Sequence, residues 1–183
     1  ENFGSFVGNA ARIDLLADKS DPVAPQMLNG LLQKTAMTAA PDRMIEQGLL
    51  GMTSNPSIFE KAIGSSQDYD VAMQALVAAG AKAEAIYDAL TIEDVGLAAD
   101  VFRPVFERTH GVDGYVSIEV SPKLAHDTAG TLADALRLWK TLDRPNVMIK
   151  IPATKEGLPA IEDALFNGLN VNVTLMFSMQ HYL

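Results

Sequence analysis

Short apolar runs alternate along this chain with longer stretches that favour helix. Three runs have the composition of strands and end at a turn residue or a proline: 114–121, 146–151 and 170–177. A shorter apolar run at 48–53, followed by a turn, predicts a further strand. The helix-favouring stretches are 26–47, 57–63, 67–79, 83–109, 125–141 and 157–167. Alternation of strand and helix at this spacing is typical of βαβ units, which build a parallel sheet.

Polar residues share one face of the three longer strands, because successive side chains of a strand point to opposite faces. They are Ser117 and Glu119 in one strand, Lys150 in the next, and Asn172 and Thr174 in the third. In an open doubly wound sheet both faces are covered by helices, and strands are apolar throughout. In a (β/α)₈ barrel only the outer face is covered, and catalytic groups lie inside at the carboxyl ends of the strands. The pattern therefore favours a barrel with a polar mouth over an open sheet.

Lys150 is the most informative of these residues. A lysine within an apolar strand reaches the rim, pairs with a carboxylate such as Glu119, or takes part in chemistry. Burial favours the neutral amine, which attacks a carbonyl group and forms a Schiff base. Glu119 would then move protons to and from the carbinolamine, directly or through one water. Hydrogen bonds from Asn55, Asn172 and Thr174 would suit the hydroxyl groups of a sugar.

Composition removes several classes of function. The chain has 183 residues, with 14 Lys and Arg against 23 Asp and Glu and a formal net charge of −9. Such a charge disfavours binding to nucleic acid and to anionic membranes. The absence of cysteine excludes disulfides, thiolate metal sites and a cysteine nucleophile. The three histidines have no metal-ligand spacing, and no run reaches the length of about 20 apolar residues that spans a membrane.

Four blocks of the sequence resemble transaldolases, in the family's order and at similar spacing. They are 53–63 (Thr-Ser-Asn-Pro-Ser-Ile-Phe-Glu-Lys-Ala-Ile), 114–122 (Gly-Tyr-Val-Ser-Ile-Glu-Val-Ser-Pro), 147–154 (Val-Met-Ile-Lys-Ile-Pro-Ala-Thr) and 171–178 (Val-Asn-Val-Thr-Leu-Met-Phe-Ser). The resemblance runs from about residue 42 to the end, and the Thr-Ser-Asn-Pro block is similar to the bacterial and plastid-type branch.

The resemblance implies a cofactor-free (β/α)₈ transferase of the pentose phosphate pathway, located in the cytoplasm or the plastid stroma. Such enzymes move a three-carbon dihydroxyacetone unit between sugar phosphates through a lysine Schiff base. By this resemblance the catalytic residues are Lys150, Glu119 and Thr174, and the substrate-binding residues are Thr53, Asn55, Ser117 and Asn172. No metal ligand is expected.

The chain departs from the family on the expected first barrel strand. The family carries an acid/base aspartate about 25 residues before the Thr-Ser-Asn-Pro block, whereas Asn29 lies nearest to that position here. Asp14 would replace it only if an insertion followed. An amide cannot accept the proton, and losing such a group slows the reaction by on the order of 10²–10⁴-fold.

The length allows only part of a barrel. We expect an irregular arm at 1–25 and an incomplete (β/α)₈ barrel at 26–183, with about strands 1–5, because a complete barrel takes about 250 residues. The chain stops at 179–183 in what looks like the first turn of a helix, and nothing corresponds to the phosphate-binding loops after strands 7 and 8. Such a barrel would leave two open sheet edges.

Three hypotheses follow. In the first, the chain is a fragment of a longer transaldolase. In the second, it is a catalytically impaired relative whose open sheet edges dock on a larger assembly. In the third, it is a Schiff-base aldolase on a related barrel. The Thr-Ser-Asn-Pro and Asn-Val-Thr blocks disfavour the third.

Overall fold

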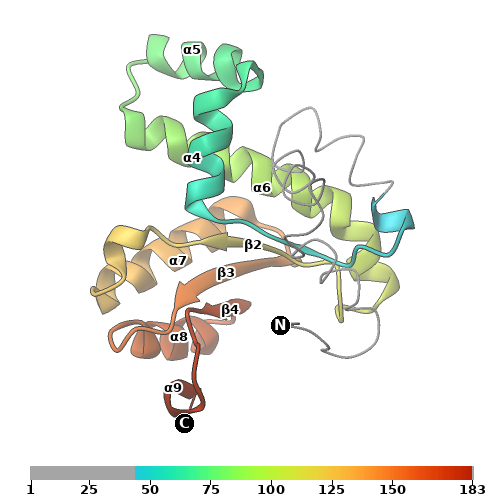
Figure 1. The fold of residues 1–183 in the computed structure, drawn as a ribbon, viewed down its shortest axis with the longest axis vertical. Coiled ribbons are helices and arrows are strands. Elements are labelled where there is room, and N and C mark those ends of the chain that lie inside the picture. The colour runs from blue at the N-terminus through green and yellow to red at the C-terminus, as the bar shows by residue number, and fades with distance from the viewer. Residues whose placement is uncertain (1–43, 183) are drawn as a thin grey trace. The chain divides into compact units, whose positions relative to one another are not determined.

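The computed structural model describes residues 44–182 (Figure 1). This part of the chain divides into two compact units. We name them the helical unit, residues 44–50 and 57–97, and the sheet unit, residues 51–56 and 98–182. The expected arm at 1–25 lies outside the described residues, and so does the expected first strand with Asn29.

The helical unit contains α4 (Pro56–Ser65) from its second residue onward, the 3₁₀ turn η1 (Gln67–Tyr69), α5 (Asp70–Ala78) and the first part of α6 (Ala83–Arg108). Its apolar core contains Ala62, Tyr69, Ile86 and Leu90. The buried hydroxyl of Tyr69 donates a 2.6 Å hydrogen bond to the buried carboxylate of Asp94. Burial and this hydrogen bond raise the pKa of Tyr69 far above its usual value, so the phenol stays protonated as the donor.

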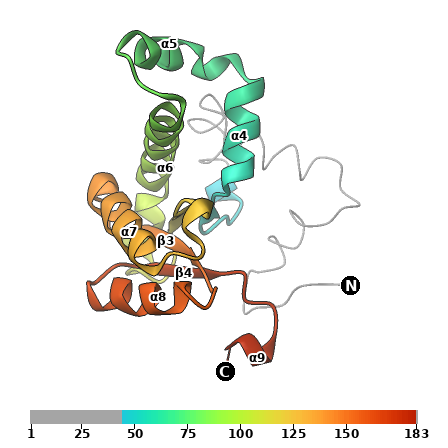
Figure 2. The same ribbon diagram turned by 90° about the vertical axis from the view of Figure 1, so that its left-hand side faces the viewer.

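The sheet unit contains four parallel strands in the order β1 (Met52–Thr53), β2 (Val116–Glu119), β3 (Val147–Pro152) and β4 (Val171–Thr174). Helix α7 (Thr128–Leu142) connects β2 to β3, and α8 (Gly157–Phe166) connects β3 to β4. The two helices lie side by side along the sheet in both views (Figures 1 and 2). The strands curl into part of a barrel, which confirms the expected incomplete (β/α)₈ architecture. The structure also contains two short segments, η2 (Pro122–Leu124) and α9 (Met179–Tyr182).

The apolar faces of β2 and β3 are buried as the alternation predicts. Val116 and Ile118 of β2 and Val147, Ile149 and Ile151 of β3 are each at most 5% exposed. Burying such side chains stabilises the unit by about 1.5–3 kcal/mol each. The polar residues between them are therefore directed to the opposite, inner face.

Two predicted strands are shorter than expected. The predicted strand at 48–53 pairs only over Met52–Thr53, because Gly48 has a φ of 100° and its N–H donates to the carbonyl of Ile45, closing the preceding turn. The predicted strand at 170–177 ends at Thr174, because Leu175 has a φ of 62° in the left-handed region, which breaks extended pairing. Local apolar character could not reveal either backbone reversal.

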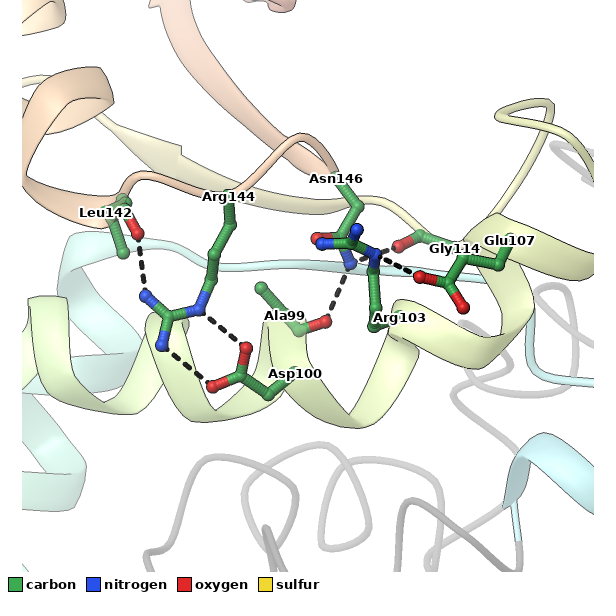
Figure 3. Close-up of polar contacts among 8 residues, drawn as sticks. All are labelled: Ala99, Asp100, Arg103, Glu107, Gly114, Leu142, Arg144 and Asn146. Atoms are coloured by element: carbon green, nitrogen blue, oxygen red, sulfur yellow. Dashed lines mark hydrogen bonds and ion pairs between the residues drawn. The ribbon is translucent and has the colours of Figure 1, made fainter.

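Asn146 fixes the point at which β3 begins (Figure 3). Its side chain is fully buried, and Nδ2 donates to the carbonyl oxygens of Ala99 in α6, at 2.7 Å, and of Gly114 before β2, at 3.0 Å. Next to it, both ends of the Arg144 guanidinium donate to the Asp100 carboxylate, at 2.7 and 2.8 Å. These contacts set the register that places the inner-face residues of β3.

Across residues 44–182, no helix is both long enough and apolar enough to pass through a membrane.

Candidate active site

Lys150 lies at the centre of the inner face. The strand register places Glu119 of β2 directly beside it on one side and Asn172 of β4 on the other. The Lys150 Nζ is 3.1 Å from Glu119 Oε2, and only 11% and 14% of the two side chains are exposed. The predicted pairing of this lysine with this carboxylate is therefore present, in a site that excludes most water.

The end of β1 supplies a second acceptor to the same amine. Lys150 Nζ donates to the backbone carbonyl of Ser54 at 3.3 Å. Ser54 is 2% exposed, and its hydroxyl donates to the carbonyl of Ser117 at 2.7 Å. The pattern of side chains does not reveal Ser54 as a site residue, although it lies inside the Thr-Ser-Asn-Pro block, because a backbone carbonyl leaves no signature in such a pattern.

Asn172 and Ser117 meet across β3. The Asn172 amide donates to the Ser117 hydroxyl oxygen at 3.0 Å, although the two residues belong to β4 and β2. Contact between inward side chains of alternate strands is how the interior of a (β/α)₈ barrel is layered. Lys150 of β3 reaches the end of β1 in the same way. These contacts require the sheet to curl.

The other predicted site residues lie at the carboxyl-terminal edge of the strands. Thr53 ends β1 and is exposed, and Asn55 follows two residues later and is exposed as well. Thr174 ends β4, half-buried and level with Pro152 of β3. The structure thus joins Lys150 to Glu119 and Asn172 to Ser117 directly. It places Thr53, Asn55 and Thr174 along the carboxyl-terminal edge.

The loops that follow β2 and β3 are tied together at this edge. Thr154 Oγ1 donates to the carbonyl of Ala125 at 2.6 Å, and Thr128 Oγ1 donates to the carbonyl of Glu156 at 2.7 Å. His126 Nδ1 lies 3.2 Å from the Glu156 carboxylate, and this hydrogen bond lowers the pKa of Glu156. Two loops beside the Lys150 site therefore share one hydrogen-bonded framework.

The groups available for chemistry are an amine, a carboxylate, an amide and hydroxyls. Within the described residues, no group of three His, Asp or Glu is arranged to hold a metal ion. A buried amine beside a carboxylate suits nucleophilic attack on a carbonyl coupled to proton transfer.

Comparison with known proteins gives one consistent family. Residues 31–183 match the family described as transaldolase/fructose-6-phosphate aldolase. "Transaldolase 2" of Nostoc sp. (strain PCC 7120) is 51% identical over 137 residues, which cover 75% of this chain and 36% of that protein. The transaldolase of Saccharopolyspora erythraea is 52% identical over 137 residues, covering 75% of this chain and 37% of the relative. The transaldolase of Thermobifida fusca is 52% identical with the same coverage. The matched part thus amounts to little more than a third of each of these relatives.

Proposed function

This chain belongs to the transaldolase/fructose-6-phosphate aldolase family, and on that premise we propose that it transfers a dihydroxyacetone unit between sugar phosphates through a Schiff base on Lys150. The observation that carries the proposal is the buried Lys150 amine 3.1 Å from Glu119 on the inner face of a parallel sheet. The relatives named as transaldolases support the same reaction class.

The first half of the proposed reaction forms the imine. Glu119 takes one proton from the Lys150 ammonium, and the free electron pair of Nζ attacks the ketose carbonyl carbon, so a C–N bond forms. The attack leaves an alkoxide on the former carbonyl oxygen, and a second proton passes from Nζ to this oxygen, directly or through one water, to give the carbinolamine. Glu119 then returns the first proton to the carbinolamine hydroxyl, which leaves as water. The product is an iminium ion, and no net proton is gained or lost.

The second half breaks the carbon–carbon bond. The iminium accepts the electron pair of the bond between the third and fourth carbons, while a base removes the proton of the fourth-carbon hydroxyl. An aldehyde leaves, and the three-carbon enamine stays on Lys150 until an acceptor aldehyde reverses the steps. Asn55, Asn172 and Thr174 would hold the sugar hydroxyls. With Asn29 nearest the position of the family's aspartate, we expect this half to be the slower one.

The finer expectations rest on the family resemblance. We propose sugar phosphates as substrates, a role in the pentose phosphate pathway, and a location in the cytoplasm or the plastid stroma. The bacterial relatives are consistent with the cytoplasm. The alternative hypothesis, a catalytically impaired subunit of a larger assembly, predicts no transfer at all.

A transfer assay tests the proposal. Fructose 6-phosphate labelled with ¹³C at the first carbon is incubated with erythrose 4-phosphate, and NMR follows the label. We expect label in a seven-carbon ketose phosphate with the unmodified chain, and none with Lys150→Met. Lys140→Met removes an exposed lysine of α7 and is the matched control, with unchanged transfer. Label released as free dihydroxyacetone without acceptor would identify an aldolase instead, and no turnover by the folded chain would reject the proposal.

A further inference from the structure

The Lys150 amine has two acceptors where an imine can use only one. An ammonium group carries three N–H donors, and here it is shared between Glu119 Oε2, at 3.1 Å, and the Ser54 carbonyl oxygen, at 3.3 Å. An iminium nitrogen carries one N–H. When Lys150 joins a carbonyl carbon, one of the two contacts must be given up.

The two acceptors differ in their freedom to move. Glu119 holds its carboxylate on a side chain with rotatable bonds, and its proposed role requires it to turn toward the carbinolamine oxygen. The Ser54 carbonyl belongs to a residue that is 2% exposed. Both the N–H and the hydroxyl of Ser54 donate to the Ser117 carbonyl, at 3.1 and 2.7 Å. Two hydrogen bonds to β2 therefore hold Ser54, the residue that carries this carbonyl.

Resting on the proposed function, we infer that the Ser54 backbone carbonyl accepts the iminium N–H of Lys150, and that the Ser54 hydroxyl is the positioning group that aims this carbonyl. A fixed dipole directed at the place where positive charge develops stabilises that charge without reorganising. The single N–H bond would also set the plane of the imine. Glu119 is then free for proton transfer.

Ser117 extends the same framework. Its carbonyl oxygen accepts hydrogen bonds from the N–H and the hydroxyl of Ser54, and its hydroxyl oxygen accepts a 3.0 Å hydrogen bond from the Asn172 amide. The Ser54 carbonyl is thereby anchored to β2 and, through it, to β4. The acceptor lies one residue beyond β1, at a residue that two hydrogen bonds hold against β2.

The test compares hydroxyl deletions at two buried sites. Ser54→Ala removes the hydrogen bond from the Ser54 hydroxyl to the Ser117 carbonyl and leaves the hydrogen bond from the Ser54 N–H in place. Thr131→Val is the matched control, because Thr131 is 1% exposed and donates a 2.8 Å bond to the Leu124 carbonyl. Ser54→Thr keeps the hydroxyl and serves as the rescue variant. Circular dichroism and the thermal midpoint show that each variant is folded.

The first readout needs no sugar. Formaldehyde and cyanoborohydride methylate lysines through an iminium, and peptide mass spectrometry gives the methylation rate at Lys150 relative to Lys140 in the same digest. We expect Ser54→Ala to lower this ratio about fivefold, the rate equivalent of about 1 kcal/mol. Ser54→Thr should lie within twofold of the unmodified chain, and Thr131→Val should not change the ratio. If Ser54→Ala does not fold, Ser54→Cys, a weak donor of similar size, should show a decrease of about threefold.

The second readout is borohydride trapping with fructose 6-phosphate. Ser54→Ala should lower the maximal trapping rate by a similar factor and leave the half-saturating sugar concentration unchanged, because the carbonyl contacts the nitrogen and not the sugar. An unchanged methylation ratio in Ser54→Ala, or an equal decrease in Thr131→Val, would overturn the inference. Normal methylation without any sugar trapping in the unmodified chain would reject the proposed function and leave the inference about Ser54 standing.

Discussion

Replacing Lys150 by methionine isolates the energetic role of the buried ion pair. Lys150→Met keeps most of the side-chain volume and removes the cation that Glu119 Oε2 contacts at 3.1 Å. It also removes the donor to the Ser54 carbonyl. Breaking a buried pair from one side costs about 3–5 kcal/mol, because a buried charge is left uncompensated.

The structure places this variant at the lower end of that range. The Glu119 side chain keeps 14% of its surface exposed, so its charge retains some hydration. We expect a loss of about 3 kcal/mol in the free energy of unfolding. For a chain of this size the thermal midpoint falls by about 2–4 °C per kcal/mol, so the expected decrease is about 6–12 °C.

The double variant tests whether the charges of Lys150 and Glu119 stabilise the fold only as a pair. Lys150→Met combined with Glu119→Leu removes both charges, and replacing a buried pair by apolar groups is often neutral or stabilising. We expect the double variant to lie within about 1 kcal/mol of the unmodified chain, far above either single variant. Urea unfolding at pH 7 measures the unmodified chain, Lys150→Met, Glu119→Leu and the double variant, with Lys140→Met as the surface control.

Two results would refute this reasoning. One is a loss below about 0.5 kcal/mol in Lys150→Met, as expected for a surface substitution. The other is additivity, in which the double variant loses the sum of the two single losses, because uncoupled residues behave in that way. Either result would mean that the pair is not energetically buried.

Three further predictions concern the framework around the site. Gly157→Ala would place a Cβ against the backbone carbonyl oxygen of Pro152, which ends β3, so we expect the free energy of unfolding to fall by about 1–3 kcal/mol. A Cβ at Gly64 meets nothing within 4 Å, so Gly64→Ala should not destabilise, and equal thermal midpoints for the two variants would contradict this. Arg144 holds the pKa of Asp100 below its usual 3.8, so the ion pair stabilises the fold above pH 3.8 and this stabilisation is lost as the pH falls through the lowered pKa. The difference in thermal midpoint between the unmodified chain and Arg144→Met should therefore shrink between pH 6 and pH 2. A constant difference would argue against this coupling. Asn146→Ala leaves two carbonyl groups without their buried donor and should cost about 2–3 kcal/mol in urea unfolding; a loss below about 0.5 kcal/mol would be inconsistent with that role.

Alternation along the strands was enough to predict the centre of the site. A period of two puts Glu119 and Lys150 on the face opposite the buried valines and isoleucines, and the structure places them level with one another. The polar side chains inside the strands also favour a barrel, since they need an inner face without helices. These features are local or depend only on parallel pairing, so the sequence contains them.

The remaining features depend on the path of the backbone. The Ser54 carbonyl reaches Lys150 only because the sheet curls enough to bring the end of β1 over β3. The contact between Asn172 and Ser117 likewise joins strands that are not neighbours. The short length of β4 follows from the left-handed conformation of Leu175, a residue type that gives no warning of it. No periodicity encodes such contacts.

Borohydride trapping on the full chain tests the central claim most directly, because it asks whether Lys150 forms an imine with a ketose phosphate. After incubation with fructose 6-phosphate and reduction, peptide mass spectrometry locates every modified lysine. We expect an adduct on Lys150 and none on the exposed Lys140. A three-carbon adduct would show cleavage as well as imine formation. A six-carbon adduct would show that the imine forms faster than it is cleaved, as we expect with Asn29 nearest the position of the family's aspartate. A folded chain without any adduct on Lys150 would contradict the account.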